Sequence, residues 1–283
     1  MGKANKAKLE LRDAAEMVDL IQTLKDIADN KLYILMQQKD RFRRFGESFA
    51  EFFRMISFTK VKHPLISNEN PKIILVVVSA EGSFLGAFNN KIFRKALDEK
   101  KRYPNAKFVA VGEKAADRFQ AMQPNLKSFV DIEKVGFYET AVAVKDHLID
   151  EVMKGEAGKV IIVYSWPKTF DTQKLRAAKL LPCDELITKQ AQFATEFEKI
   201  IEESESADII GYLSNLWITT RIFEILLDTV LAATSAQAKF LEDSVDKMKK
   251  ERDKTKVKFR KAKKGDIDKS LRETFSARMM ANK

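Results

Sequence analysis

A loop with two glycines follows one of the most apolar stretches of the chain. It reads "SAEGSFLGAFNN", Ser79 to Asn90, directly after "IILVVV" at 73–78. Many phosphate-binding loops begin this way, with backbone N–H groups converging on an anion that a lysine also reaches. This loop has no Lys-Ser or Lys-Thr and no Gly-x-Gly-x-x-Gly spacing, and Glu81 would place a negative charge beside the phosphate. We therefore expect packing or a partner contact here rather than phosphate binding.

The other residues of the loop fit that interpretation. Phe84, Leu85 and Phe88 are apolar and are expected to pack, while Asn89 or Asn90 is suited to cap the helix that follows.

No other group of residues predicts catalysis or metal binding. Cys183 is the only cysteine, which excludes an internal disulfide and favours a reducing compartment. The two histidines, His63 and His147, cannot complete a zinc site with one thiol. Most acidic residues lie among lysines, as on a solvated helix surface. We expect no catalytic residue, no cofactor and no metal.

The composition predicts long helices. Of the 283 residues 33% are charged, against about 25% in an ordinary globular domain, and only 10 are glycine and 6 proline. Residues 1–58 contain no proline, and a heptad seam runs through them, interrupted by two polar residues: Ala14, Met17, Ile21, Leu24, Ala28, Lys31, Leu35, Gln38, Phe42, Phe45, Phe49, Phe52 and Ile56. This spacing favours a coiled coil. The alternative, a helix lying on a globular core, needs a wider apolar stripe.

Two further segments complete the chain. Residues 71–190 alternate short apolar strands with helical stretches, which predicts a Rossmann-like, mostly parallel α/β domain; the last two pieces, joined by "PKTFDT", suggest a hairpin at the sheet edge. Residues 205–283 again read as a long helix and would pair with the first in an antiparallel coiled coil. By length, this helix outruns the first by about 20 residues at 1.5 Å per residue.

The basic charge of the chain is local. Residues 246–264 hold 11 Lys or Arg against 3 acids, a net of +8 in a chain of net +10. A lysine-rich helix and a pI near 9.4 are compatible with a nucleic-acid-binding protein. Only one aromatic residue, Phe259, interrupts this stretch, and an α/β domain between two long helices is not needed for that role. A scaffold coiled coil that joins two copies of the chain is a further alternative.

These motifs, in this order, resemble the gamma subunit of F-type ATP synthases over essentially the whole chain. That family has Ser-Asp-Arg/Lys-Gly-Leu-Cys-Gly-Gly/Ala-x-Asn after a strand, and the loop here keeps Ser79, Gly82, Gly86 and Asn89. In the first helix, "LIQTLKDIADNK" ends in Lys31 at the position of a family lysine, with Leu24 at the place of a methionine. "KDRFRRFGESFAE" is similar to a further family stretch.

The resemblance implies a central rotor stalk that is not itself an enzyme. It implies three alpha and three beta subunits around one copy of this chain, an epsilon-type subunit, a membrane c-ring and no nucleic acid. Residues implied to contact beta are Leu24, Lys25, Lys31, Leu85, Lys254, Lys258, Lys263 and Lys264. Leu271, Phe275 and Met279 are implied to lie in an apolar sleeve of alpha and beta.

The sequence departs from the family in ways that indicate a divergent or alternate-branch member. Lys263 and Lys264 replace an Arg-Gln pair, Asp268 replaces a threonine, and Leu85 replaces the loop cysteine. A gamma-like subunit of an F-type-derived ATPase with another role is therefore also open. We expect a peripheral protein at the cytoplasmic face of the membrane, since neither a signal or transit peptide nor a span of about 18 apolar residues is seen.

Overall fold

The computed structural model describes residues 3–55, 63–169, 172–183 and 206–281, with the side chains of all but 41, 43–55, 206–207 and 281. Its elements are α1 (Lys3–Met55), β1 (Ile73–Val78), α2 (Phe88–Arg102), β2 (Lys107–Val111), α3 (Glu113–Gln120), β3 (Lys127–Phe129), α4 (Ile132–Val135), α5 (Phe137–Met153), β4 (Lys159–Pro167), β5 (Gln173–Leu181) and α7 (Ser206–Ala281). The chain forms two compact units, Met1–Asn30 with Gln237–Lys283, and Lys31–Ala236.

The second unit is built on a five-stranded sheet with strand order β3-β2-β1-β4-β5. The first four strands are parallel, so that Val76 lies opposite both Val109 and Ile162. β5 runs antiparallel to β4 at the edge, which confirms the predicted hairpin. The mostly parallel α/β domain is therefore confirmed; the short β3 and α4 were not predicted.

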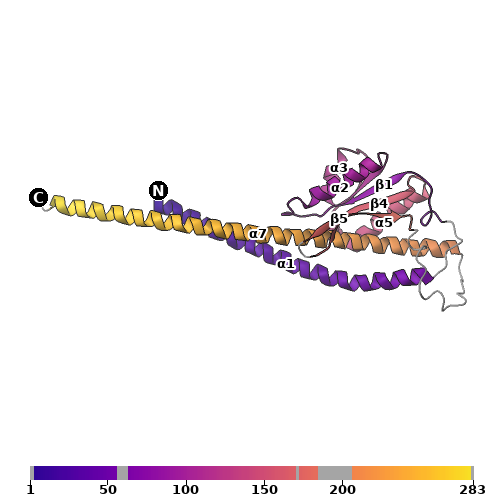
Figure 1. Ribbon diagram of the computed structural model, residues 1–283, viewed down its shortest axis with the longest axis horizontal. Coiled ribbons are helices and arrows are strands. Elements are labelled where there is room, and N and C mark those ends of the chain that lie inside the picture. Colours follow the sequence, from indigo (N-terminus) through magenta and orange to yellow (C-terminus); the bar gives the residue numbers. More distant parts are fainter. Residues whose placement is uncertain (1–2, 56–62, 170–171, 184–205, 282–283) are drawn as a thin grey trace. The chain divides into compact units, whose positions relative to one another are not determined.

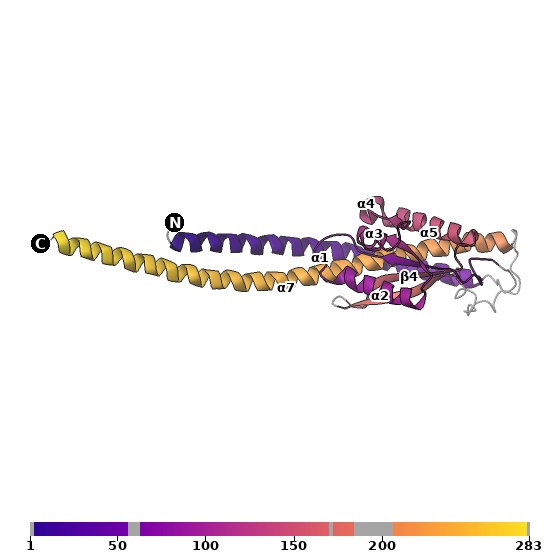
Figure 2. The same ribbon diagram turned by 90° about the horizontal axis from the view of Figure 1, so that it is seen from above.

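Both faces of the sheet are covered by helices, which explains why β1 is apolar throughout. Leu75 and Val77 pack in a cluster with α2 and α3, whereas Ile74, Val76 and Val78 pack in a cluster with α5 and α7. Figure 1 shows α2 and α3 on one side of the sheet and α5 with the first part of α7 on the other. In the view from above, α5 again lies alongside that part of α7 (Figure 2).

The first part of α7 is a core element rather than a surface helix. Between residues 209 and 236 only Tyr212 is exposed. Ile210, Ile218 and Ile222 pack on the sheet side, while Leu227 and Leu231 pack against α1. A helix that is apolar on nearly all sides has to be enclosed by other elements, as this one is.

The heptad seam predicted for α1 is confirmed at only part of its positions. In the unit of residues 31–236, Leu32 and Leu35 pack with Leu227, Val230 and Leu231; in the other unit, Ala28 packs with Ala238 and Leu241. The positions of Ala14, Ile21, Ala28, Leu35 and Phe42 therefore face inward. Of the alternate positions, Leu24 packs beside Ala28 as predicted. The other three are wrong by one residue: Val18, Leu32 and Lys39 take the place of Met17, Lys31 and Gln38.

The exposure of two predicted seam residues shows the difference. Met17 is exposed and Val18 is buried, although both are apolar. Val18 lies four residues after Ala14 and Met17 lies three residues after it, so the two side chains lie at opposite edges of the same apolar helix face. The side chains of Phe45, Phe49 and Phe52, and all of Ile56, lie outside the described residues.

The C-terminal end of α7 is exposed over its last turns. Thr255 is the last buried residue among those described, and every residue from 263 to 280 is exposed. This agrees with the predicted overhang of the C-terminal helix. The division into 1–58, 71–190 and 205–283 stays a prediction, because the compact units divide α1 and α7 instead.

Candidate functional site

The loop after β1 is fixed at its base by Ser79. This residue is fully buried; its Oγ accepts a hydrogen bond from the Ala115 N–H (3.0 Å) and donates one to the Val111 carbonyl (3.3 Å). Gly112 passes so close that a Cβ on it would lie 2.6 Å from the carbonyl oxygen and Oγ of Ser79, and its φ is +95°. The contact therefore requires glycine at 112.

Glu81 occupies the N–H groups that a bound anion would use. One carboxylate oxygen accepts from the Ile132 N–H (2.9 Å) and the other from the Glu113 N–H (3.3 Å). These are the first residues of α4 and α3, whose N–H groups have no partner within their own helices. The loop therefore places its own carboxylate at the N-termini of α3 and α4.

Asn89 has a different role from the predicted one. Neither it nor Asn90 caps α2, because the cap position is Ala87, which makes no side-chain hydrogen bond. The Asn89 side chain instead accepts from the Ala80 N–H (3.0 Å) and donates to the Ala80 carbonyl (2.9 Å). It satisfies both backbone groups of a residue just outside the strand, and so closes the loop onto α2.

The tip of the loop has an unusual backbone. Gly82 and Gly86 have φ of +112° and +51°, and Phe84 has φ of +60°, which is uncommon for an aromatic residue. Phe84 is half exposed, whereas Leu85 packs against the cluster on the α2 side of the sheet. Leu85 as a partner contact stays a prediction.

Both lysines of α1 that the resemblance pointed to are ion-paired within their own unit. Lys25 donates to Asp29 at 2.6 Å, and this hydrogen bond raises the pKa of the lysine. Lys31 contacts both carboxylate oxygens of Glu133 in α4, at 2.6 and 2.7 Å. Leu24 is half-buried beside the Ala28 cluster. A partner would therefore have to compete for these two charges.

The basic stretch of α7 offers less engaged cations. Lys254 lies 3.3 Å from Glu251 on its own helix. In the described part of the chain no carboxylate lies within 4 Å of Lys258, Lys263 or Lys264, and all three are exposed. Sequence proximity of like charges leaves this surface strongly positive.

The residues beyond this stretch form an exposed apolar stripe. Leu271, Phe275 and Met279 are spaced by four and are 53, 64 and 78% exposed; Ile267 extends the stripe by one step. Positions four apart lie on one helix face. Large apolar side chains gathered on one exposed face indicate a partner surface.

The structure also contains a charged cluster that was not predicted. Asp228 of α7 pairs with Lys39 of α1, and Arg221 pairs with Glu224 at 2.7 Å. The Asp228 side chain is 14% exposed, and burial raises its pKa, an effect that Lys39 opposes. The sequence signal was three charges spaced by three and four inside the apolar stretch 217–233, which places them on one helix face.

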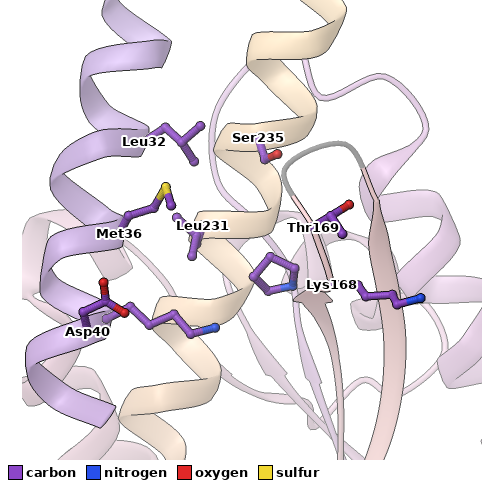
Figure 3. A pocket seen from close by; sticks show the side chains of 9 residues that line it. Leu32, Met36, Asp40, Lys168, Thr169, Leu231 and Ser235 are labelled. Carbon is purple, nitrogen blue, oxygen red and sulfur yellow. The ribbon is translucent and has the colours of Figure 1, made fainter. Parts of the chain in front are cut away.

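Two cavities lie next to this cluster and share Lys39. The first, of about 230 Å³, is lined by α1, α7 and the residues at the end of β4; Figure 3 shows Leu32, Met36 and Leu231 around it, with Lys168 and Thr169 opposite α1. The second, of about 280 Å³, is lined by Lys39, Phe42, Tyr164, Trp166, Arg176, Arg221, Glu224, Leu227 and Asp228.

The described residues contain no metal site and no membrane span. No three His, Cys, Asp or Glu side chains among them are grouped closely enough to hold an ion. None of the helices over the described ranges has a stretch long and apolar enough to cross a bilayer.

Comparison with known proteins gives one consistent result. The family model described as ATP synthase matches residues 5–278. The ATP synthase gamma chain of Desulforamulus reducens is 23% identical over 277 residues, covering 96% of this chain and 97% of the relative, and that of Syntrophobacter fumaroxidans is 25% identical over 282 residues, covering 92% and 95%. The rotor structure of Euglena gracilis mitochondrial ATP synthase matches with a TM-score of 0.61 at 15% identity, covering 93% of this chain and 98% of that one. This last similarity concerns the fold.

Proposed function

The chain belongs to the ATP synthase family as a gamma-type subunit, and from this premise we propose that it is the central rotor stalk of an F-type ATP synthase or ATPase. In this role it is not a catalyst. It couples ion-driven rotation of the membrane ring to conformational changes at catalytic sites carried by alpha and beta subunits. The observation that carries the proposal is α7, one 76-residue helix that starts in the core of the α/β domain and ends in exposed residues.

A single asymmetric shaft acts through differences in contact. It cannot present the same face to several equivalent beta subunits at once, so each is biased toward a different open or closed state. Such a shaft shifts each equilibrium only by its differential interaction energy with the two states. Rotation passes these biases from one subunit to the next, and torque is the resulting sequence of population shifts.

Exposure and ion pairing support the proposed beta contacts to different degrees. Lys258, Lys263 and Lys264 are exposed cations without a carboxylate nearby in the described residues, so they are the strongest candidates for pairing with acidic segments of beta. Lys254 is next, while Lys25 and Lys31 already have partners. Leu24 and Leu85 are the proposed apolar contacts.

The exposed stripe at Leu271, Phe275 and Met279 is proposed to lie in an apolar sleeve formed by alpha and beta. Burying these side chains in the assembly would remove the exposed apolar surface that the isolated chain carries. The full assembly proposed is three alpha and three beta subunits around one copy of this chain, with an epsilon-type subunit against the α/β domain and a c-ring beyond it. Within this assembly, the present chain is proposed to lie peripherally at the cytoplasmic face of the membrane.

The alternatives have less support. The gamma chains that match along nearly the whole length argue against a nucleic-acid-binding or scaffold protein. A gamma-like subunit of a specialised F-type-derived ATPase would have the same shaft structure, and only the function of the whole complex would differ.

The test is purification of the tagged chain from its native host, followed by subunit identification and an ATPase assay. The proposal predicts two larger nucleotide-binding subunits, each in threefold excess over this chain, and loss of coupled ATP hydrolysis when the chain is truncated after Met248. Recovery of the chain alone, or with nucleic acid, would overturn it.

Charge variants sharpen this test. Replacing Lys258, Lys263 and Lys264 together by glutamine should lower ATPase activity of the purified complex, and added salt should lessen the difference from wild type. A matched variant with Lys91 and Arg94 of α2 and Arg118 of α3 changed to glutamine loses the same charge from exposed positions on the α/β domain. Equal effects of the two variants would show that the α7 lysines make no specific contact.

A further inference from the structure

The second cavity is lined by four elements of the unit of residues 31–236 and is open to solvent on the side of Arg176, which is exposed. α1 provides Lys39 and Phe42, β4 provides Trp166, β5 provides Arg176, and α7 provides Asp228 among others. At about 280 Å³ it is close to the lower end of the range for small-molecule sites, about 300–1,000 Å³. Apolar walls with a few convergent charges are typical of such sites.

The charges in this cavity do not balance. Lys39 pairs with Asp228, and Arg221 pairs with Glu224. The third cation, Arg176, has no carboxylate within 4 Å among the residues that the structure describes. The cavity therefore has one positive charge in excess.

Arg176 is an exposed side chain that feels the charge of Asp228 but makes no ion pair among the described residues. Its guanidinium carbon lies 3.8 Å from the centre of the Trp166 ring, a stacked arrangement that holds the group flat. A guanidinium stacked on its face still has its N–H donors in the plane, where a carboxylate binds with two parallel hydrogen bonds. The side chain is thus preorganised for a planar acidic group.

The remaining walls set the kind of molecule. Phe42 and Leu227 give an apolar surface beside the charges. Asp228 and Glu224 would repel a second negative charge, which selects against polyanions such as nucleotides. We propose that this cavity binds a small organic acid with a planar ring and one carboxylate, the carboxylate on Arg176 and the ring against Phe42 and Leu227.

Such a ligand would join α1, α7 and the sheet at one point. The inference concerns a site on the chain itself and does not rest on the stalk function, so its failure would leave the proposed function unaffected.

The test is calorimetric titration of the purified full-length chain with 2-naphthoate as the probe, and with 2-naphthamide as a neutral molecule of the same shape. Trp166 fluorescence provides a second signal, because Trp166 lines the cavity and the chain has only 2 tryptophans. Naphthoate should bind at least tenfold more tightly than naphthamide.

Two variants assign the binding to Arg176. Arg176→Gln should weaken naphthoate binding at least about tenfold, because both charge-assisted hydrogen bonds to the carboxylate are lost, and leave naphthamide binding unchanged. Lys179→Gln removes the same charge from an exposed position on the same strand that does not line the cavity, and should have no effect. Circular dichroism would check that both variants fold.

The proposal is overturned by equal affinity for the acid and the amide, by equal effects of the two variants, or by no binding up to the solubility of naphthoate. Binding that is lost in Arg176→Gln only for the acid would establish the site.

Discussion

Replacing Asn89 by alanine should destabilise the α/β domain measurably, although the side chain is only half-buried. The change removes two hydrogen bonds to Ala80, of 3.0 and 2.9 Å. At about 1 kcal/mol net for each bond, the loss is about 2 kcal/mol. Alanine has the higher helix propensity and returns up to about 0.5 kcal/mol. The expected decrease in the free energy of unfolding is therefore about 1.5 kcal/mol.

Asn90 provides the matched control. It is the next residue of the same helix turn, is exposed, and makes no side-chain hydrogen bond with the described residues. Asn90→Ala should gain the propensity term alone, about 0.5 kcal/mol. The difference of about 2 kcal/mol between the two variants isolates the contribution of the Ala80 contacts.

Urea unfolding followed by tryptophan fluorescence measures this difference. Both tryptophans, Trp166 and Trp217, lie in the unit of residues 31–236 that contains Asn89, so the signal reports on that unit. The midpoints should separate while the slopes stay equal. Equal midpoints for the two variants would refute the assigned role of Asn89.

Three further predictions concern other parts of the chain. Lys39→Met leaves the Asp228 carboxylate buried without its ion-pair partner and should lower the free energy of unfolding by about 2 kcal/mol near neutral pH, less than for a fully buried pair. Burial raises the pKa of Asp228 and Lys39 opposes this, so the loss of stability relative to wild type should shrink as pH falls through the raised pKa. Unfolding curves at a series of pH values measure this dependence. Gly112→Ala should destabilise the protein by more than about 3 kcal/mol, because the clash with Ser79 adds to the backbone strain, whereas Gly155→Ala, also at positive φ but in open space, should cost about 1 kcal/mol. Thermal unfolding compares the two variants, and similar decreases in Tm would contradict the clash. Gly265→Ala, in an exposed turn of α7 with no atom near the added methyl, should stabilise that helix by about 1 kcal/mol and slow local amide exchange, and unchanged exchange rates around 265 would count against it.

The sequence predicted the elements better than the contacts between them. The β4–β5 hairpin and the buried parallel strands follow from local patterns, because strands covered on both faces are apolar throughout. The α1 seam was placed half correctly because apolar residues occupy both flanks of the inward face. Met17 and Val18 are equally apolar, so only the position of α7 decides which one is buried.

The side-chain roles in the loop were harder to predict. Asn89 has the right residue type for a cap, and only the path of the chain brings Ala80 within reach of its amide. Glu81 was interpreted only through its charge, because its two N–H partners lie 32 and 51 residues further on. Such contacts depend on the sheet topology and leave no local pattern.

The enclosure of α7 within the α/β domain has a mechanical consequence. A turning force applied to its exposed end can rotate the helix about its own axis only by dragging Ile210, Ile218 and Ile222 out of the close-packed interior beside the sheet. The strength of this joint is therefore the folding stability of the domain itself. Destabilising core substitutions far from any partner surface would therefore let α7 rotate within the domain when torque is applied, while the complex still assembles.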